Sequence, residues 1–194
     1  YHPGGFFGFD GLVCLTPDGK LHIHTGIGNL GTFSHSSTSR IAAEVLRMDW
    51  EDCIIERGDS RRHLPWNSGQ FGSNTNFTMA RTNYVATMDL LNKMKEIASR
   101  NLGGRPEQYD YDGRRVFRKD KPGTGMTYGQ AARAAIALGG RFDGHELPTD
   151  IDPMTKLSAT ALAGTGLVGV AKDTLPVLGA PSSFAAAFIE IELD

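Results

Sequence analysis

The sequence has few of the features that are typical of membrane proteins, disulfide-rich proteins or secreted proteins. No apolar run approaches the roughly 20 residues that a transmembrane helix needs. The chain does not open on a basic segment followed by an apolar one, as a secretory signal does. Only two cysteines occur, Cys14 and Cys53, and their separation matches no zinc, iron–sulfur or redox motif. We therefore expect two reduced thiols in a cytoplasmic protein.

An excess of charge of one sign is also lacking. The 20 Lys and Arg residues nearly balance the 22 Asp and Glu residues, and the basic residues are scattered apart from a loose cluster between Arg114 and Lys121. Such a balance gives no field that attracts nucleic acid or an anionic membrane surface. With 194 residues and 40% hydrophobic content, the chain can bury a core. It starts at Tyr1 and not at methionine, which we interpret as a piece of a larger polypeptide.

What is present is an alternation of strand and helix patterns. Asp18-Gly19 fits the tight turn of a first hairpin, because Asp-Gly readily takes the positive φ that such turns need. Apolar residues such as Phe77, Tyr84 and Leu91 recur at helical steps and predict a long helix. The first half is expected to contain strands at 11–16 and 21–26, a helix at 36–48, a strand at 53–59, a loop at 60–75 and a helix at 76–100.

The second half is less regular. Thr127 and Gln130 fit a capping box at the start of a helix. The elements expected are a hairpin at 108–119, a helix at 128–138 closed by two glycines, a Gly-, Pro- and Thr-rich stretch at 141–181 and a strand at 182–194. The fold class predicted is α+β, with mixed sheets and packed helices in one region over residues 1–194, subdivided at most into 1–104 and 105–194.

Two motifs point to other chemistry but lack its context. The glycines of "GTGLVG", Gly164–Gly169, fit a dinucleotide-binding fingerprint, with Glu190 about where a ribose-binding acid belongs. That site needs a helix directly after the glycines, and Pro176 follows too soon. His22 and His24 share one face of a strand, as paired metal ligands sometimes do, but no third ligand is recognisable nearby. We expect no dinucleotide and no metal at these places.

Two loops of similar chemistry remain. "GIGNLGTFSHSST" and "NSGQFGSNTN" are rich in glycine, hydroxyl and amide groups, contain no acid, and each leads directly into a helix. Backbone N–H groups at the positive end of a helix bind anions, and two such loops together suit a pyrophosphate. The alternative is that Ser34, Ser36, Asn74 and Thr75 are ordinary N-caps. Local chemistry alone favours neither.

The order of these pieces resembles the molybdopterin-binding large subunit of the molybdenum hydroxylases, the family of xanthine dehydrogenase and carbon monoxide dehydrogenase. In that family a strand with "PDG" and "HTG" leads into a "GQGxxT" loop, a helix "IAAEEL", a strand ending in "GD", a "GxxxSR" loop and a long helix. This chain has "TPDGKLHIHTG", "NLGTFSHSS", "RIAAEVL", "IIERGD" and "SGQFGSNT" in the same order. No one of these motifs is specific, but five in register are.

The resemblance implies a molybdopterin cofactor carrying molybdenum, in bacteria commonly the cytosine dinucleotide form. Its contacts would come from the first loop, through Gly31, Thr32, Phe33, Ser34, His35 and Ser36, and from the second loop, through Gly69, Gln70, Phe71, Gly72, Ser73, Asn74 and Thr75. The implied partners are the rest of the molybdenum subunit, a 2Fe-2S iron–sulfur subunit and commonly a subunit with FAD. The implied activity is a molybdenum-dependent oxidoreductase, a hydroxylase or dehydrogenase, acting on a small organic substrate.

The chain departs from the family at several places. Leu30 and Phe33 stand where the family has glutamine and glycine, and Asn74 stands where it often has arginine. The Gly-x-Gly-Glu segment with the family's catalytic glutamate does not occur in this sequence, so no catalytic or metal-ligating residue is assigned. Two alternatives stay open. One is a non-catalytic assembly subunit that completes the fold of a catalytic partner, and the other is a hydratase on the same scaffold.

Overall fold

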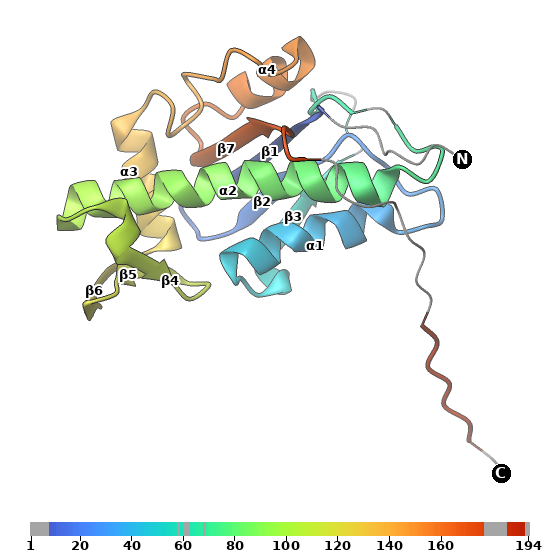
Figure 1. Ribbon diagram of the computed structural model, residues 1–194, viewed down its shortest axis with the longest axis horizontal. Helices are drawn as coiled ribbons and strands as arrows, with labels where there is room; N and C mark the ends of the chain where they lie inside the picture. Colours follow the sequence, from blue (N-terminus) through green and yellow to red (C-terminus); the bar gives the residue numbers. More distant parts are fainter. Residues whose placement is uncertain (1–7, 58, 60–62, 68, 177–185, 193–194) are drawn as a thin grey trace.

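The computed structural model describes residues 8–57, 59, 63–67, 69–176 and 186–192. Four of its strands are β1 (Asp10–Leu15), β2 (Leu21–His24), β3 (Cys53–Glu56) and β7 (Leu167–Lys172). They form a sheet in the order β3-β2-β1-β7 (Figure 1). β1 is antiparallel to both of its neighbours, whereas β2 and β3 are parallel. Among the described strands, the last in sequence, β7, therefore lies beside the first, β1.

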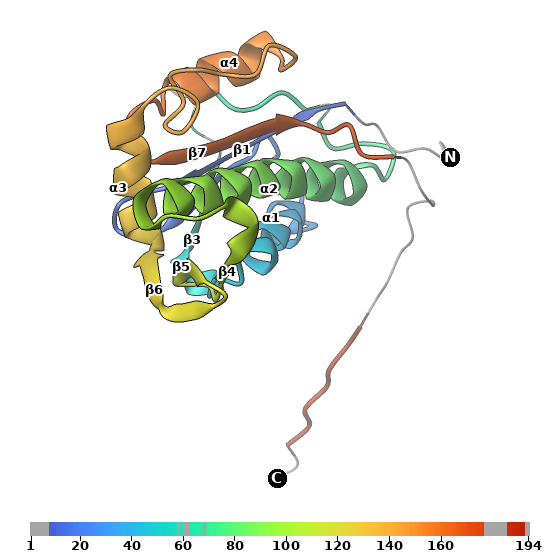
Figure 2. The same cartoon turned by 60° about the vertical axis from the view of Figure 1, so that its left-hand side comes forward.

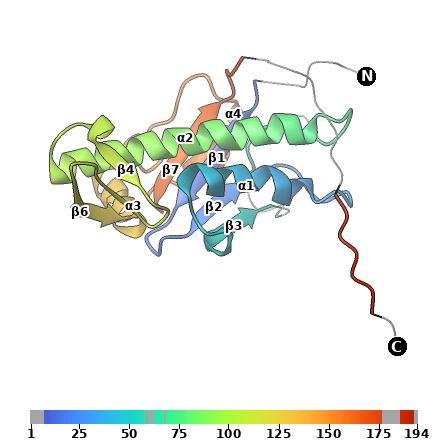
Figure 3. The same ribbon diagram turned by 60° about the horizontal axis from the view of Figure 1, so that its bottom comes forward.

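Two helices lie side by side on one face of this sheet (Figure 3). They are α1 (Ser34–Leu46) and α2 (Thr75–Leu102). α1 is the crossover that two parallel strands require, here between β2 and β3. α2 has 28 residues, is therefore about 42 Å long, and packs against β1 and β7. No helix within the described ranges is both long and apolar enough to cross a membrane.

Strand alternation divides the core between the two faces of the sheet. On the α2 face, Val13, Leu15, Leu21 and Ile23 are buried against apolar residues of the second half of α2. α2 lies very close to the strands at two glycines. A Cβ at Gly11 would be 2.0 Å from the carbonyl oxygen of Thr82, and a Cβ at Gly169 would be 2.4 Å from that of Ala86. The sheet thus admits the helix backbone only because two strand residues have no side chain.

On the other face, α4 (Pro153–Thr160) lies over the sheet (Figure 2) and covers a smaller core. Leu12, Cys14, Val168 and Val170 pack there against Ile151 and Ala159. Asp152 begins α4 by accepting a hydrogen bond from the N–H of Met154. α4 covers β1 and β7 and leaves the β2–β3 side of this face less covered.

A three-stranded antiparallel sheet lies at the far end of α2 (Figure 2). It consists of β4 (Tyr109–Tyr111), β5 (Arg115–Arg118) and β6 (Lys121–Thr127), and α3 (Tyr128–Leu138) follows. Short 3-10 turns at Trp50–Asp52 and Pro106–Gln108 precede β3 and β4. Tyr128 is buried and donates from its hydroxyl to the carbonyl of Leu46 at 2.8 Å, which joins α3 to the end of α1.

Much of the expected order is confirmed. The two hairpins, the two helices of the first half and the capping box between Thr127 and Gln130 are all present. α1 begins two residues earlier than expected, at Ser34, and α2 one residue earlier, at Thr75. In "GTGLVG" the glycines open β7, and no helix follows within the described residues, so the order of a dinucleotide site is absent there.

Other expectations are wrong. β6, α4 and β7 were not predicted. The strand expected at 182–194 lies partly outside the described residues, and the part that is described, residues 186–192, forms no strand. Phe188 is 98% exposed there. A strand needs a neighbour to satisfy its backbone groups, and residues 186–192 lie away from the sheets in Figure 1.

Candidate functional site

The structure brings the two predicted loops together at one end of the molecule. α1 and α2 run in the same direction, so their N-termini are adjacent (Figure 3). The hydroxyl of Ser37 donates to Oδ1 of Asn76 at 3.1 Å, which links the first turns of the two helices. Two turns further along α2, Nδ2 of Asn83 donates at 2.9 Å to the carbonyl of Thr38, the residue after Ser37. Two positive helix ends therefore face the same region.

In the first loop an asparagine organises the backbone. Oδ1 of Asn29 accepts the N–H of Gly31 at 2.9 Å and that of Phe33 at 3.2 Å. The N–H groups of Ser36 and Ser37 both donate to the carbonyl of Phe33. Those of Ser34 and His35 therefore precede the first intrahelical bond and point out of the helix end.

The second loop repeats this device. Oδ1 of Asn67 accepts the N–H of Gly69 at 2.7 Å. The first intrahelical bond of α2 is from the N–H of Thr78 to the carbonyl of Asn74 at 2.8 Å. The N–H groups of the three residues between them consequently lie ahead of that bond, at the positive end of the helix.

The backbone of both loops is strained directly before each helix. Phe33 has φ 53° and Ser73 has φ 58°, in the left-handed region that side chains disfavour, and Gly72 also has φ 58°. Among the described non-glycine residues only Arg47, which ends α1, shares this feature. Strained positions of this kind gather at binding sites, where the surrounding structure holds them for a reason other than stability.

Buried polar atoms without partners lie between and beneath the loops. His35 is 6% exposed, and among the described residues its Nδ1 has no hydrogen-bond partner. The same holds for Oγ of Ser39 and Oδ1 of Asn83 at the contact between α1 and α2. Burial, and then the charge of Arg57, lowers the pKa of His35. The neutral imidazole thus offers a hydrogen-bond acceptor inside the first loop.

The predicted site residues differ in how open they are. Gly31, Thr32, Phe33, Gly69, Phe71, Gly72 and Ser73 are exposed; Ser36, Gln70 and Thr75 are half-buried; and Ser34, His35 and Asn74 are buried. Oγ of Ser34 lies 2.7 Å from Oγ1 of Thr32. The guanidinium of Arg40 stacks on the ring of Trp50 at 4.6 Å, away from the loop.

The sequence reading missed the two asparagines that shape the loops. Asn29 and Asn67 each stand two residues before a glycine, in "NLG" and "NSG", and the side chain of each accepts from that glycine's N–H. The repeat was visible in the sequence, because asparagine readily bonds the backbone two residues on. Both loops are therefore built by the same local rule.

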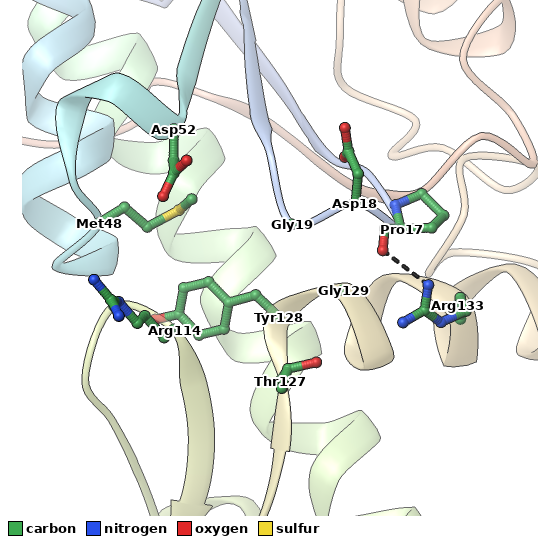
Figure 4. Close-up of a pocket in the computed structure, with 11 residues that line it drawn as sticks. Pro17, Asp18, Gly19, Met48, Asp52, Arg114, Thr127, Tyr128, Gly129 and Arg133 are labelled. Atoms are coloured by element: carbon green, nitrogen blue, oxygen red, sulfur yellow. Dashed lines mark hydrogen bonds between the residues drawn. The ribbon is translucent and has the colours of Figure 1, made fainter.

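A hollow that is separate from the two loops lies at the opposite end of β2 (Figure 4). Its volume is about 280 Å³. Arg133 donates to the carbonyl of Pro17 at 2.9 Å, and Arg114 lies 3.4 Å from Asp49. The charged groups here mostly bind protein atoms and join α3 to the first hairpin. No group of three or more His, Cys, Asp or Glu among the described residues is arranged to hold a metal.

The two loops lie at the adjacent N-termini of α1 and α2. Residues 5–194 match the molybdopterin cofactor-binding domain family, and the chain belongs to this family. The aldehyde oxidoreductase molybdenum-binding subunit PaoC of Escherichia coli O157:H7 is 30% identical over 100 residues, which are 51% of this chain and 13% of that protein. The family resemblance seen in the sequence is thereby confirmed.

Solved structures show the same fold. CO dehydrogenase from Oligotropha carboxidovorans superimposes with a TM-score of 0.63 and 20% identity, over 88% of this chain and 18% of that one. Quinoline 2-oxidoreductase from Pseudomonas putida 86 does so with a TM-score of 0.56 and 17% identity, over 87% and 19%. The α+β class is confirmed. The chain spans between 13% and 19% of the length of these relatives.

Proposed function

We propose that the two loops hold the phosphates and the pterin of a molybdopterin cofactor in a molybdenum-dependent oxidoreductase. The single observation that carries the proposal is the convergence of two acid-free loops at two adjacent helix N-termini, joined by the bond between Ser37 and Asn76. One helix end suits one phosphate, and two adjacent ends suit a ligand that carries several anionic groups.

The residues present fit such a group. The N–H groups of Ser34 and His35 and those at the start of α2 are donors for phosphate oxygens. Nδ1 of His35 needs a donor, which a phosphate lacks and a pterin or cytosine amine has. The exposed rings of Phe33 and Phe71 offer faces for a flat heterocycle.

Asn29 limits which hydrogen-bond donors of the first loop are available to a ligand. Its Oδ1 already accepts the N–H groups of Gly31 and Phe33, so a phosphate oxygen uses these two donors only if the asparagine moves aside. Oγ of Ser34 and Oγ1 of Thr32 share one hydrogen bond, so one of these two hydroxyls and that of Ser36 donate to a ligand without such a movement. We therefore assign the phosphate contact to the serines and not to Arg40, which is held by Trp50.

When bound, the cofactor supplies two-electron redox chemistry at molybdenum. The part of this chain is to bind and orient it. We further propose the cytosine dinucleotide form, a cytoplasmic location, and assembly with the rest of a molybdenum subunit, an iron–sulfur subunit and a flavin subunit. A hydratase on the same scaffold would hold the cofactor through the same two loops. The second candidate, a non-catalytic assembly subunit, is favoured by Leu30 and Phe33, which are 70% and 65% exposed and apolar.

Elemental and nucleotide analysis tests the proposal. Protein purified in its native assembly is expected to carry close to one molybdenum per copy of this chain and to release CMP on acid hydrolysis. Molybdenum without CMP retains the cofactor and rejects only the dinucleotide form. Absence of both rejects the cofactor site and leaves the assembly subunit.

Matched variants then locate the contact. Ser34→Ala combined with Ser36→Ala is expected to lower molybdenum and pterin content by tenfold or more, because charge-assisted hydrogen bonds are worth about 1.5–3 kcal/mol each. Arg40→Ala is the control and should keep full content. Loss of the cofactor from Arg40→Ala, with retention in the serine variant, contradicts the assignment.

A further inference from the structure

A cavity lies on the face of the central sheet that α1 and α2 do not cover. Its volume is about 450 Å³, and its floor is formed by side chains of β1, β2 and β3. Ala161 and Leu162, which follow α4, form part of its wall. The volume is in the range of sites that take small organic molecules. This cavity is separate from the two loops and has no part in the function proposed above.

Strand pairing gathers the polar groups on the cavity floor. His22 and His24 point to the same face because they are two residues apart on β2. Cys14 on β1 is the direct neighbour of His22, and Glu56 on β3 is the direct neighbour of His24. The H-x-H motif of the sequence therefore presents two imidazoles next to a thiol and a carboxylate.

Two side chains on this floor form a hydrogen bond whose donor and acceptor can be assigned. Nδ1 of His22 lies 2.8 Å from Oε1 of Glu56, and both side chains are about a quarter exposed, at 23% and 24%. An ionised carboxylate only accepts hydrogen bonds, so Nδ1 of His22 carries the hydrogen. In the neutral ring Nε2 is then the acceptor. Glu56 thus determines which nitrogen of the neutral His22 ring is the acceptor toward a ligand in the cavity.

The remaining lining is mostly apolar or already bonded. Cys14 lies 3.7 Å from Oγ1 of Thr165, and burial raises the pKa of its thiol to about 11. The thiol is therefore neutral and offers carbon- and sulfur-lined surface rather than a ligand for a metal. No Lys or Arg is found among the described lining residues.

We propose that this cavity binds a neutral organic molecule of one or two rings that carries an N–H or O–H donor, and that His22, oriented by Glu56, accepts the hydrogen bond. A charged ligand is disfavoured because the described lining has no Lys or Arg to pair with an anion, and its carboxylate, that of Glu56, is already engaged by an imidazole. The donor is required because the buried acceptor would otherwise lose its water without gaining a partner.

Two probes of the same shape test the proposal by calorimetric titration of the protein in its native assembly. Indole has a ring N–H, and 1-methylindole has a methyl group in its place. Indole is expected to bind at least tenfold more tightly than 1-methylindole. Equal affinities overturn the proposal because they show an apolar hollow without donor recognition, and no binding of either probe overturns it as well.

Two variants then assign the recognition to the pair. His22→Phe removes the acceptor and should abolish the preference for indole. Glu56→Gln, which keeps the shape but no longer fixes the hydrogen on Nδ1, should reduce the preference several-fold. The control is His145→Phe, since His145 forms a pair with Asp143 at the same distance of 2.8 Å outside this cavity. A preference that is unchanged in either cavity variant contradicts the proposal.

These outcomes are independent of the cofactor. Molybdenum content measured on the same variants should equal that of the wild type, because neither side chain belongs to the two loops. A variant that loses its preference for indole but keeps its molybdenum separates the cavity from the cofactor site.

Discussion

The guanidinium of Arg81 holds the carboxylate of Asp173 through two hydrogen bonds, Nε to Oδ2 at 2.6 Å and Nη2 to Oδ1 at 2.9 Å. Arg81 lies in the second turn of α2, and Asp173 directly follows β7. Nη1 of Arg81 also donates to the carbonyl of Pro176 at 2.9 Å. One side chain near the candidate site therefore fixes the path of the chain as it leaves the sheet.

Arg81→Ala should destabilise the protein strongly. The side chains of Arg81 and Asp173 are only 14% and 0% exposed, and breaking a buried pair from one side typically costs about 3–5 kcal/mol because the other charge stays buried. The measurement is urea unfolding followed by circular dichroism. Arg118→Ala is the matched control, because its two-bonded partner Asp120 is largely exposed. Equal shifts in the two variants would show that the Arg81 pair is not special.

Lys93→Met should expose the outer edge of the sheet. Nζ of Lys93 donates to the carbonyl of Val168 at 2.9 Å, and Oδ2 of its ion-pair partner Asp89 accepts the N–H of Val170 at 3.0 Å. These side chains occupy backbone groups of the edge strand that another chain could otherwise pair with. We expect a loss of about 1–3 kcal/mol in unfolding free energy and faster aggregation by light scattering.

Lys119→Met is the control for this edge. Nζ of Lys119 also donates to a backbone carbonyl, that of Glu107 at 2.8 Å, but at an exposed position. Its replacement should leave the scattering unchanged. If both lysine variants aggregate at the same rate, loss of a positive charge and not exposure of the sheet edge is the cause.

Gly11→Ala should separate α2 from the sheet. The added Cβ would stand 2.0 Å from a backbone oxygen of the helix, which has no flexible end that can turn away. Overpacking of this kind usually costs about 1–3 kcal/mol, and more where backbone must move. Gly28→Ala serves as the reference, because a Cβ there meets nothing within 4 Å. Thermal unfolding of the two variants side by side gives the answer, and similar melting temperatures would refute the close approach.

His35→Leu should destabilise the protein less, relative to the wild type, at low pH than at neutral pH. Burial, and then Arg57, lowers the pKa of His35 from its ordinary value of 6.5. The unfolded chain therefore takes up a proton at a higher pH than the folded chain. The stability that neutral His35 contributes is fully present above about pH 6.5 and is lost as the pH falls from there toward the folded pKa.

The leucine variant lacks this decline. Urea midpoints of wild type and variant at pH 8 and pH 5 should converge toward, or cross in favour of, the variant at pH 5. Comparison at each pH cancels the other titrating groups. A difference that is the same at both pH values means that His35 does not titrate in this range.

The buried face of α2 shows how much of the structure could be predicted from the pattern of apolar residues. The helix was predicted almost to its ends, but Phe77 and Tyr84, expected to face inward, are partly exposed, and Tyr84 reaches 36%. The first half of the helix instead buries Thr78, Thr82 and Asn83. A hydrophobic period cannot reveal a contact made through small polar residues, and the glycines that permit the close approach lie far away in the sequence.

The candidate site, like α2, could be predicted only in part. Composition alone marked both loops, since glycine, hydroxyl and amide residues before a helix are a local signal. That the loops meet depends on α1 and α2 being parallel, and the order of the motifs in the family supplied this expectation. β7 and α4 went unrecognised because β7 is a buried six-residue strand opened by glycines, and α4 has only eight residues.

The parallel course of α1 and α2 has an electrostatic consequence. Two helices side by side with like ends together repel each other, whereas antiparallel neighbours attract. Until an anion sits at their shared end, that repulsion opposes the packing of the loop region, and multivalent anions such as sulfate should relieve it more than chloride does. The proposed cofactor, as a multivalent anion at this shared end, should therefore also stabilise the packing of α1 beside α2.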